Sequence, residues 1–404
     1  MKLNWKNTFI LGLGFFAISL MWPIYNVYMP ILYSKFVASK ALIGVLMTLD
    51  NWLALTITPV VGILSDRTRT RFGRRIPYLL VGAPVAAIFM ALIPLGWATS
   101  LALFVTFAVM MNVAMASFRS PVIALMPDVT PAPLRSKANG IINFMGGFGY
   151  IAATFGGAIL YKIYPSYPFY GSALVMVAVT IAFLLWIREP AESTEKSERF
   201  TFGRITDRSA IMMLLAIFFW FVAYNSLETW LSTYVKEHLG YHEAETGFLL
   251  TVVGALFILF AIPAGFLAEG ARRWKGLSRK WTIILGLGLL VATFFLMGQQ
   301  ADVSKALYLF AVAGIAWALV NINSYPMITQ MAGPGQVGTY TGMYYLFQSL
   351  AMIAGPPIYG WIFDKTGYGY FFPLSAGIMG VALICMLFVT KGEASRKAAA
   401  DTAA

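Results

Sequence analysis

Long apolar runs recur along the whole chain, and no other feature limits its possible folds as strongly. Many of these runs reach the roughly 18 to 20 residues that cross a bilayer core about 30 Å thick. Hydrophobic residues make up 59% of the 404 residues, and charged residues make up 11%. A soluble protein of this length needs a larger polar surface than such a composition provides. The sequence therefore predicts an all-α integral membrane protein.

Apolar windows along the chain predict twelve transmembrane helices in two pseudo-symmetric six-helix bundles. They lie at residues 9–32, 42–64, 77–98, 101–126, 138–163, 170–187, 210–235, 245–268, 281–300, 305–330, 338–363 and 370–390. The first run is too long for the apolar core of a signal peptide, so we interpret it as an uncleaved helix. A polar segment at the midpoint separates the bundles. We expect an N-terminal bundle at 1–187, a cytoplasmic linker at 188–209, a C-terminal bundle at 210–390 and a cytoplasmic tail at 391–404.

Basic residues are distributed unevenly between the two sides of this arrangement. With the termini in the cytoplasm, the inner segments hold 22 lysines and arginines and the outer gaps hold six. Positively charged loops stay on the cytoplasmic side of a membrane. The sequence therefore predicts a multi-pass protein of the cell (inner) membrane, with both termini in the cytoplasm.

The net charge of +12 does not indicate a nucleic-acid partner, because the basic residues lie in short gaps between apolar runs. The single cysteine, Cys385, allows no intrachain disulfide. His238 and His242 are spaced for a metal on one helix face, but no third ligand lies near them in the sequence, so we expect no metal site and no cofactor. Neither histidine nor Cys385 lies beside a plausible catalytic partner, which argues against an enzyme.

The two halves of the chain resemble each other at an offset of 203 residues. "GILSDRTRTRFG" (62–73) then aligns with "GFLAEGARRWKG" (265–276), and "ALIGVLMTLDN" (41–51) aligns with "AETGFLLTVVG" (244–254). The offset is close to half the chain length, so a duplicated bundle is expected. Repeated halves with a substrate site between them are typical of secondary transporters, and a duplicated scaffold without transport is the alternative.

The first repeat resembles the signature loop of the major facilitator superfamily. The longer string "SDRTRTRFGRRIPYLLVG" (65–82) is similar to the glycoside-pentoside-hexuronide:cation symporters, and most of all to their sucrose:proton branch. The resemblance implies the major facilitator fold and a gate in which acidic residues and arginines bond neighbouring helix ends. The residues that it assigns to the gate are Asp66, Arg67, Arg71, Arg74, Arg75, Asp128, Arg135 and Glu269.

The fourth span matches the same branch with two departures. Pro121 and Asp128 fit the family pattern, but the family's acidic position is Asn112 and its arginine position is Ile123. The family's proton-handling carboxylate is therefore absent from that place. Arg119 lies one helical turn before the family arginine and faces the same side as Asn112. A structural ion pair is the alternative role for Arg119.

Ionisable groups inside spans are costly and usually serve function. Three qualify here, namely Asp50, Arg119 and Glu228. Asp50 and Glu228 are the candidates for carrying the coupling cation, and we favour Asp50. A proton is the expected ion, with Na⁺ as the alternative, for which Thr48 and Asn51 offer oxygens near Asp50. Asp50 can also be a buried carboxylate with a structural role.

Amides, hydroxyls and aromatic rings gather in several spans, a combination that suits a sugar. The candidate substrate-binding residues are Trp22, Tyr25, Asn26, Asn112, Arg119, Tyr224, Asn225, Glu228, Trp230, Trp317, Asn321, Tyr345 and Gln348. Taken singly, such aromatics more often form the interfacial belt and such amides often pin helices together.

These observations predict a secondary active transporter that couples a cation to a sugar such as a disaccharide or glycoside. We expect a monomer in the lipid bilayer whose partner is a small molecule. A carrier of amphiphilic, lipid-like or drug-like solutes is the alternative within transport, and a non-transporting membrane sensor is another.

Overall fold

The computed structural model is almost entirely helical, and it describes residues 5–71, 73–130, 134–186, 207–271, 274–300, 302–333 and 336–393. Most of the expected linker and all but the first residues of the expected tail lie outside these ranges. Within them, 12 spans are long and apolar enough to cross a membrane, and each overlaps one of the expected ranges. The prediction of an all-α fold with twelve transmembrane helices is confirmed.

Contacts between backbone positions divide the chain into two compact units. Unit 1 comprises Met1–Glu195 and Glu228–Thr251, and unit 2 comprises Lys196–Leu227 and Val252–Ala404. Two helices, α9 (Arg208–Glu237) and α10 (Glu245–Glu269), each contribute to both units. The segment from Glu228 to Thr251 therefore packs with the first six spans, although it follows the midpoint of the chain.

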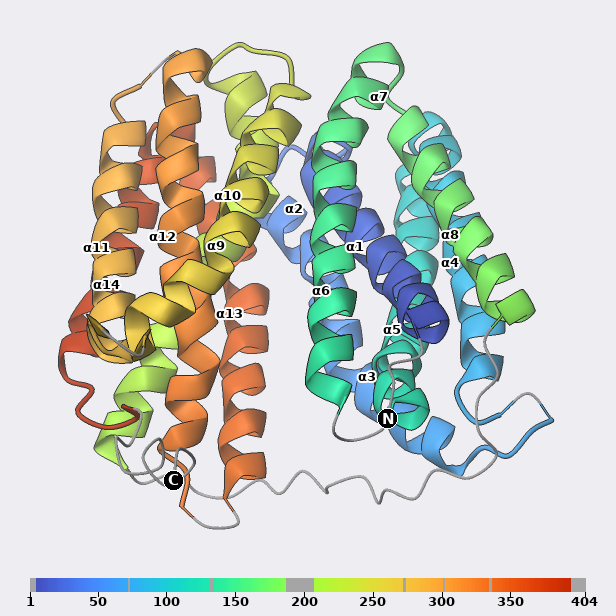
Figure 1. Ribbon diagram of the computed structural model, residues 1–404. Helices are drawn as coiled ribbons and strands as arrows, with labels where there is room; N and C mark the ends of the chain where they lie inside the picture. The colour runs from blue at the N-terminus through green and yellow to red at the C-terminus, as the bar shows by residue number, and fades with distance from the viewer. Residues whose placement is uncertain are drawn as a thin grey trace. The chain divides into compact units, whose positions relative to one another are not determined.

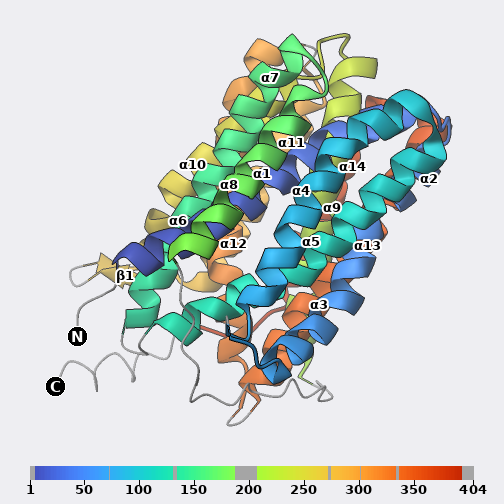
Figure 2. The ribbon, with the colours of Figure 1, turned by 90° about the vertical axis from the view of Figure 1, so that its right-hand side faces the viewer.

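Unit 1 is built on long helices that pack side by side. Its elements are α1 (Trp5–Ser34), α2 (Lys40–Met47), α3 (Leu49–Arg67), α4 (Ile76–Thr99), α5 (Leu101–Val129), α6 (Arg135–Ile151), the π-helix η2 (Ala152–Gly156), α7 (Gly157–Ile163) and α8 (Tyr167–Trp186). Helix α4 packs against α5 and α8, and α1 packs against α6 (Figure 2). Glycines allow close approach, since a Cβ on Gly149 would lie 2.3 Å from the carbonyl oxygen of Phe16.

Unit 2 contains the remaining spans. Besides its parts of α9 and α10, its elements are β1 (Gly270–Ala271), β2 (Trp274–Lys275), α11 (Arg279–Met297), α12 (Val303–Gln330), α13 (Val337–Thr366), the 3₁₀-helix η3 (Tyr368–Tyr370) and α14 (Phe371–Leu387). Helix α11 lies beside α12 and packs against both α12 and α14 (Figure 1). The two short strands pair antiparallel. They form a hairpin in the second copy of the sequence repeat.

Two transmembrane spans are interrupted. The second span breaks at Thr48, so α3 begins at Leu49 and places Asp50 in its first turn. Backbone N–H groups without helical partners gather at such a start, and they favour a carboxylate. The fifth span changes from α-helix to π-helix at Ala152–Gly156 and back. A π-turn holds one extra residue and is often found at functional sites.

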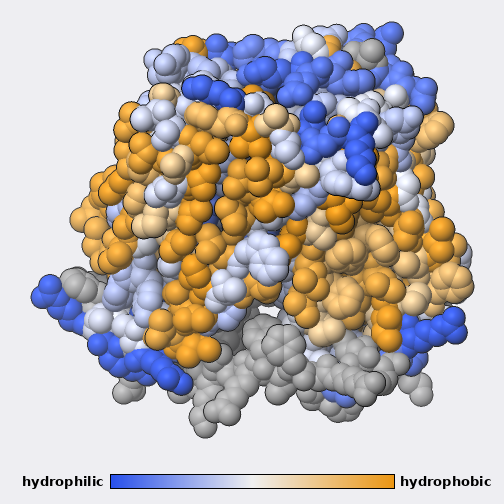
Figure 3. Space-filling model, turned by 180° about the vertical axis from the view of Figure 1, so that it is seen from behind, coloured by the Kyte–Doolittle hydropathy of each residue, from blue (hydrophilic) through white to orange (hydrophobic). Residues whose placement is uncertain are grey.

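The surface of the helices is apolar along their middle and polar at their ends. On the face in Figure 3, hydrophobic side chains cover the central part of the helices and hydrophilic side chains gather toward the ends. Large residues such as Leu174 and Ile262 are 71% and 72% exposed. Exposed apolar area of this extent suits lipid contact rather than water.

Candidate functional site

The arginine loop joins α3 to α4 and folds on itself through a tight turn. The backbone N–H of Gly73 donates to the carbonyl of Thr70 at 3.1 Å, and the Thr70 hydroxyl donates to the Gly73 carbonyl at 2.7 Å. Gly73 has φ 108°, a conformation that residues with a Cβ rarely adopt. The turn places Arg74 and Arg75 directly before α4, where both side chains are buried.

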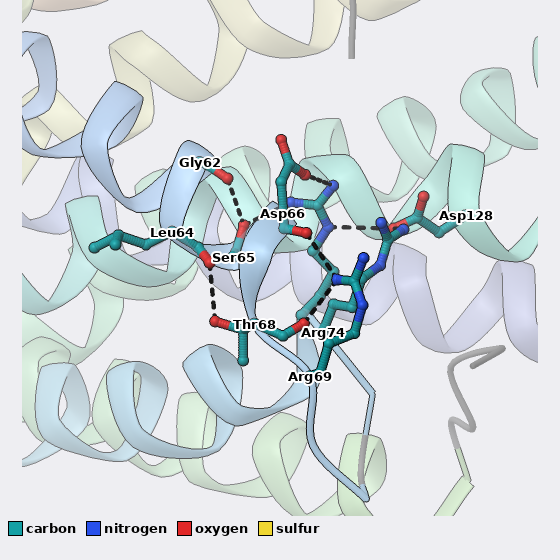
Figure 4. A network of polar contacts seen from close by, with 9 residues as sticks. Gly62, Leu64, Ser65, Asp66, Thr68, Arg69, Arg74 and Asp128 are labelled. Atoms are coloured by element: carbon teal, nitrogen blue, oxygen red, sulfur yellow. Dashed lines mark hydrogen bonds and ion pairs between the residues drawn. The ribbon is translucent and has the colours of Figure 1, made fainter. Parts of the chain in front are cut away.

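Arg75 bridges the ends of α3 and α5. Figure 4 shows the network around Asp66, Arg74 and Asp128. The Arg75 guanidinium lies 2.5 Å from the Asp66 carboxylate of α3 and 3.2 Å from the Asp128 carboxylate of α5. It also donates to the hydroxyl of Ser65 at 2.5 Å. Arg74 lies 3.1 Å from the same Asp128 oxygen. Removing one partner from a buried ion-pair network leaves an uncompensated charge, so the members are expected to act together.

The other expected gate residues are placed differently. Arg69, which is not among the expected gate residues, donates to the carbonyls of Asp66 and Thr68 and so stabilises the end of α3. Arg67 and Arg71 are exposed. The backbone of Arg135 begins α6, and its side chain lies outside the described residues. Four of the eight expected gate residues therefore meet in unit 1, namely Asp66, Arg74, Arg75 and Asp128.

Unit 2 has a counterpart of this network at the repeat-related position. Glu269, the repeat mate of Asp66, forms an ion pair with the buried Arg279. Glu393, which follows α14, accepts hydrogen bonds from the backbone N–H groups of Arg279 and Lys280 at the start of α11. These bonds satisfy N–H groups that a helix start leaves without partners.

The start of α9 is held in a similar way. The hydroxyl of Ser209 accepts from the backbone N–H groups of Thr390 and Lys391, and Asp207 forms an ion pair with Lys391. The hydrogen bond from Lys391 lowers the pKa of Asp207, and the same contact raises the pKa of Lys391. These contacts hold Thr390 and Lys391, which follow the last span, against the start of α9.

A polar cluster lies inside the spans of unit 1, and we define it as Tyr25, Asp50, Asn112 and Arg119. Asp50 is 9% exposed, and its Oδ1 accepts from the backbone N–H and the side-chain amide of Asn51 at 2.7 and 2.8 Å. The Arg119 guanidinium is close enough to attract the Asp50 carboxylate electrostatically. The Arg119 side chain itself is exposed.

Asn112 extends the unit 1 cluster to α1. Its side-chain amide donates to the Tyr25 hydroxyl at 3.1 Å, and both residues are at most 1% exposed. Among the described residues no partner accompanies the Asn112 Oδ1. Trp22 packs edge-on against Tyr25 with ring centroids 6.2 Å apart, and Asn26 is half-buried one residue further. The Asn112 amide of α5 is therefore hydrogen-bonded to a phenol of α1.

Glu228 and Trp230 lie on the part of α9 that belongs to unit 1. Trp230 is fully buried. Glu228 is half-buried, and its Oε1 accepts a hydrogen bond from the Tyr150 hydroxyl of α6 at 3.2 Å. Tyr150 was not singled out in the sequence. Its surroundings, "GGFGYIAATFGG" (146–157), are rich in small residues, a pattern that indicates close helix packing in a membrane but no particular contact.

The candidates in unit 2 form an aromatic group on α9 and α12. The Tyr224 ring stacks on the Trp317 ring at 4.2 Å and 5°, and Phe221 meets the same Trp317 edge-on at 5.6 Å. The Asn225 amide donates to the Met352 carbonyl at 3.1 Å and so joins α9 to α13. That contact fits the helix-pinning alternative for Asn225.

Further along α12 and α13, three tyrosines cluster. Ring centroids of Tyr325, Tyr344 and Tyr345 lie 5.2 to 6.1 Å apart. Tyr345 is 53% exposed, and Asn321 and Gln348 are half-buried on the same two helices. Among the described residues, no group of three His, Cys, Asp or Glu is placed to hold a metal ion.

A sequence model of the Major Facilitator Superfamily matches residues 11–356 and 235–403. The chain belongs to the major facilitator superfamily. Superfamily membership makes it a transporter rather than an enzyme, and a multi-pass integral membrane protein.

Two curated superfamily relatives match nearly the whole chain. Multidrug resistance protein 1 of Bacillus subtilis is 24% identical and covers 92% of this chain and 93% of its own length. The class H tetracycline resistance protein of Pasteurella multocida is 25% identical and covers 94% and 93%. A solved D-xylose-proton symporter has a TM-score of 0.74 at 16% identity, over 97% of this chain and 99% of its own. That likeness shows the shared fold alone.

Proposed function

We propose that this major facilitator transporter is a proton-coupled symporter of a sugar such as a disaccharide or glycoside. The unit 1 cluster is the observation that carries the proposal. It combines a buried carboxylate in a broken helix, a nearby guanidinium and an amide–phenol pair inside transmembrane spans. Charged and polar groups at such depth are costly and are retained where they serve transport.

The proposed division of roles follows from the geometry of the cluster. Asp50 lies at a helix start with its carboxylate buried, which suits a group that exchanges a proton; Na⁺ is the alternative ion, with Thr48 and Asn51 supplying further oxygens. Asn112, with an unpartnered carbonyl oxygen, and Glu228 would accept hydrogen bonds from sugar hydroxyls. Within unit 2, the stacked rings of Tyr224 and Trp317 are of the kind that covers the C–H face of a sugar.

The string at 65–82 supports placing the protein near the sucrose:proton branch. In this structure the string supplies Ser65, Asp66, Arg74 and Arg75 to one network. We infer that the network stabilises the cytoplasmic side when it is closed. The proposal includes an orientation with both termini in the cytoplasm, a location in the inner membrane and a monomeric state.

Transport by purified protein in liposomes tests the proposal. Radiolabelled sucrose, maltose and a β-glucoside would be supplied outside, with an inward proton gradient, an inward Na⁺ gradient or neither. We expect uptake of at least one of these sugars above its equilibrium level with the proton gradient alone. Uptake only with Na⁺ would reassign the ion, and no uptake under any gradient would contradict a sugar symporter.

A drug-like solute is the second candidate, and the full-length similarity to multidrug and tetracycline resistance proteins favours it. The same liposomes with labelled tetracycline and a cationic dye distinguish the two candidates. Proton-driven movement of tetracycline or dye, together with inactivity toward all three sugars, would establish this second candidate instead.

A further inference from the structure

Tyr150 connects the candidate site to a second set of contacts in unit 1. Its hydroxyl donates to the Glu228 carboxylate, and its backbone carbonyl accepts from the Thr154 hydroxyl at 3.0 Å. Thr154 in turn accepts from the hydroxyl of Thr251 on α10 at 2.8 Å. Tyr150 of α6 therefore contacts Glu228 of α9 through its side chain and, through its backbone carbonyl and Thr154, the second turn of α10.

The start of α10 and the turn before it pack closely on η2 and α7. We name these contacts the α7–α10 zipper and define it by Thr154, Tyr161, Lys162, Glu243, Glu245, Gly247 and Thr251. Lys162 forms an ion pair with Glu245 at 2.6 Å, and Tyr161 donates to Glu243 at 3.3 Å. Lys236 lies 3.2 Å from the same Glu243.

Gly247 makes the zipper possible. A Cβ at this position would lie 2.4 Å from the Thr154 carbonyl oxygen and 2.8 Å from the Ala158 Cβ. The contact is therefore backbone against backbone, over a carbonyl that belongs to the π-turn. Ala158 beneath it is fully buried. Because close-packed interfaces switch between discrete arrangements, we expect the contacts of the zipper to break together when α7 and α10 separate.

We propose that Tyr150 is a positioning residue that couples occupation of Glu228 to the α7–α10 zipper. In the absence of substrate, the hydrogen bond from Tyr150 holds the Glu228 carboxylate and stabilises the closed zipper, because a charged acceptor strengthens that bond. A substrate hydroxyl that displaces Tyr150 from this carboxylate breaks the bond, and the zipper then opens more readily. The functional meaning of this coupling rests on the proposed role of Glu228 in binding substrate.

Cysteine labelling tests the coupling without substrate. Cys385→Ser removes the native thiol, and Ala158→Cys places a reporter under Gly247 that reacts only when the zipper opens. Purified protein in lipid nanodiscs, accessible from both faces, would be treated with a membrane-impermeant maleimide. Tyr150→Phe should speed labelling about tenfold, equivalent to about 1.4 kcal/mol, as expected for one hydrogen bond to a charged group.

Two comparisons make this result specific. Tyr164→Phe removes a hydroxyl from an exposed tyrosine nearby and should leave the labelling rate unchanged. In a Glu228→Leu background, Tyr150→Phe should add less than a twofold change, since the acceptor is already absent. A full tenfold increase in that background, or no increase in the Glu228 protein, would overturn the proposal.

The reporter itself can be checked independently. Should Ala158→Cys fail to fold, Ala244→Cys provides a second fully buried alanine beside the zipper. Labelling needs no transported solute, so the result stands apart from the liposome experiment. Loss of the labelling effect alone would remove the role of Tyr150, while absence of sugar uptake alone would remove the proposed function.

Discussion

Single residues in the unit 1 cluster carry the proposed chemistry, and the most specific prediction concerns the proton-carrying role of Asp50. A buried carboxylate that releases a proton during each cycle cannot be replaced by an amide. In Asp50→Asn, uptake driven by a proton gradient should fall to the level of protein-free liposomes, while exchange of internal for external sugar survives. Accumulation against a gradient by this variant would transfer the coupling role to Glu228.

Arg119 gives a second prediction at this scale. The guanidinium is planar and has five donors, so a lysine retains its charge but not its paired hydrogen bonds. If Arg119 binds substrate, Arg119→Lys should reduce the apparent affinity about tenfold, as measured by the sugar concentration at half-maximal exchange. An unchanged concentration would indicate a structural role for Arg119 instead.

At the arginine loop, Asp66 contributes one of the two carboxylates that hold Arg75. Asp66→Asn should leave membrane insertion intact but slow transport about tenfold or more, because Arg75 then lacks half of its charge compensation. Glu237→Gln, the same change from a carboxylate to an amide at an exposed position outside the gate, is the matched control and should transport normally. Wild-type transport by Asp66→Asn would contradict the gate role.

At the scale of elements, the turn between α9 and α10 makes the stability of the folded protein depend on pH, and the sign of this dependence can be predicted. Burial acts to raise the pKa of Glu243, but hydrogen bonds and the neighbouring Lys236 and His242 outweigh it and lower the pKa. A lowered pKa stabilises the folded state above the unfolded pKa of about 4.3, and this contribution is lost as the pH falls through the folded value. Tyr161 also faces this carboxylate.

The corresponding variant is Glu243→Gln. The Lys236 side chain is about half exposed, so water screens its ion pair with Glu243. Losing this pair should therefore lower the free energy of unfolding by about 1 kcal/mol or less. Thermal unfolding in detergent should show an apparent Tm about 2 °C below that of the unmodified protein at pH 7, with the difference vanishing toward pH 3. A difference that persists at pH 3 would mean that packing, and not charge, causes it.

Interruptions within elements mark the limit of sequence-based prediction. Long apolar windows predicted twelve spans because hydropathy alone decides which segments enter a bilayer. No glycine or proline lies next to the break at Thr48, and the sequence around Ala152–Gly156 predicts an ordinary α-helix. Such interruptions depend on tertiary contacts, which a single sequence does not contain.

The same limit applies to the candidate site. The arginine loop could be located because its residues are adjacent in sequence, but the hydroxyl of Ser65 and the phenol of Tyr150 meet their partners only through packing. Within the substrate candidates, Asn225 bonds a backbone carbonyl and Trp230 is fully buried, whereas Tyr345 is exposed. Periodicity places residues on a face without showing what the face contacts.

At the scale of the whole molecule, the uneven distribution of basic residues predicts the orientation in the membrane. A fluorescent protein that matures only in the cytoplasm, fused after Ala404, should fluoresce in a bacterial host, and alkaline phosphatase fused there should be inactive. Fusions after Ser100, between the third and fourth spans, should behave oppositely. Active phosphatase at the C-terminus would reverse the orientation and place the arginine loop outside.

The π-turn also has a consequence for how this sequence can be aligned and edited. A π-turn is one residue longer than the α-helical turn that it replaces. Deleting Ala153 would therefore restore a regular α-helix without turning the residues that follow, because the π-turn already absorbs the extra residue. A homologue with a single-residue gap here should still present acidic partners to Tyr161 and Lys162. The same gap within α7, before Tyr161, would instead rotate both residues by about 100°, the angle of one residue, and turn them away from Glu243 and Glu245.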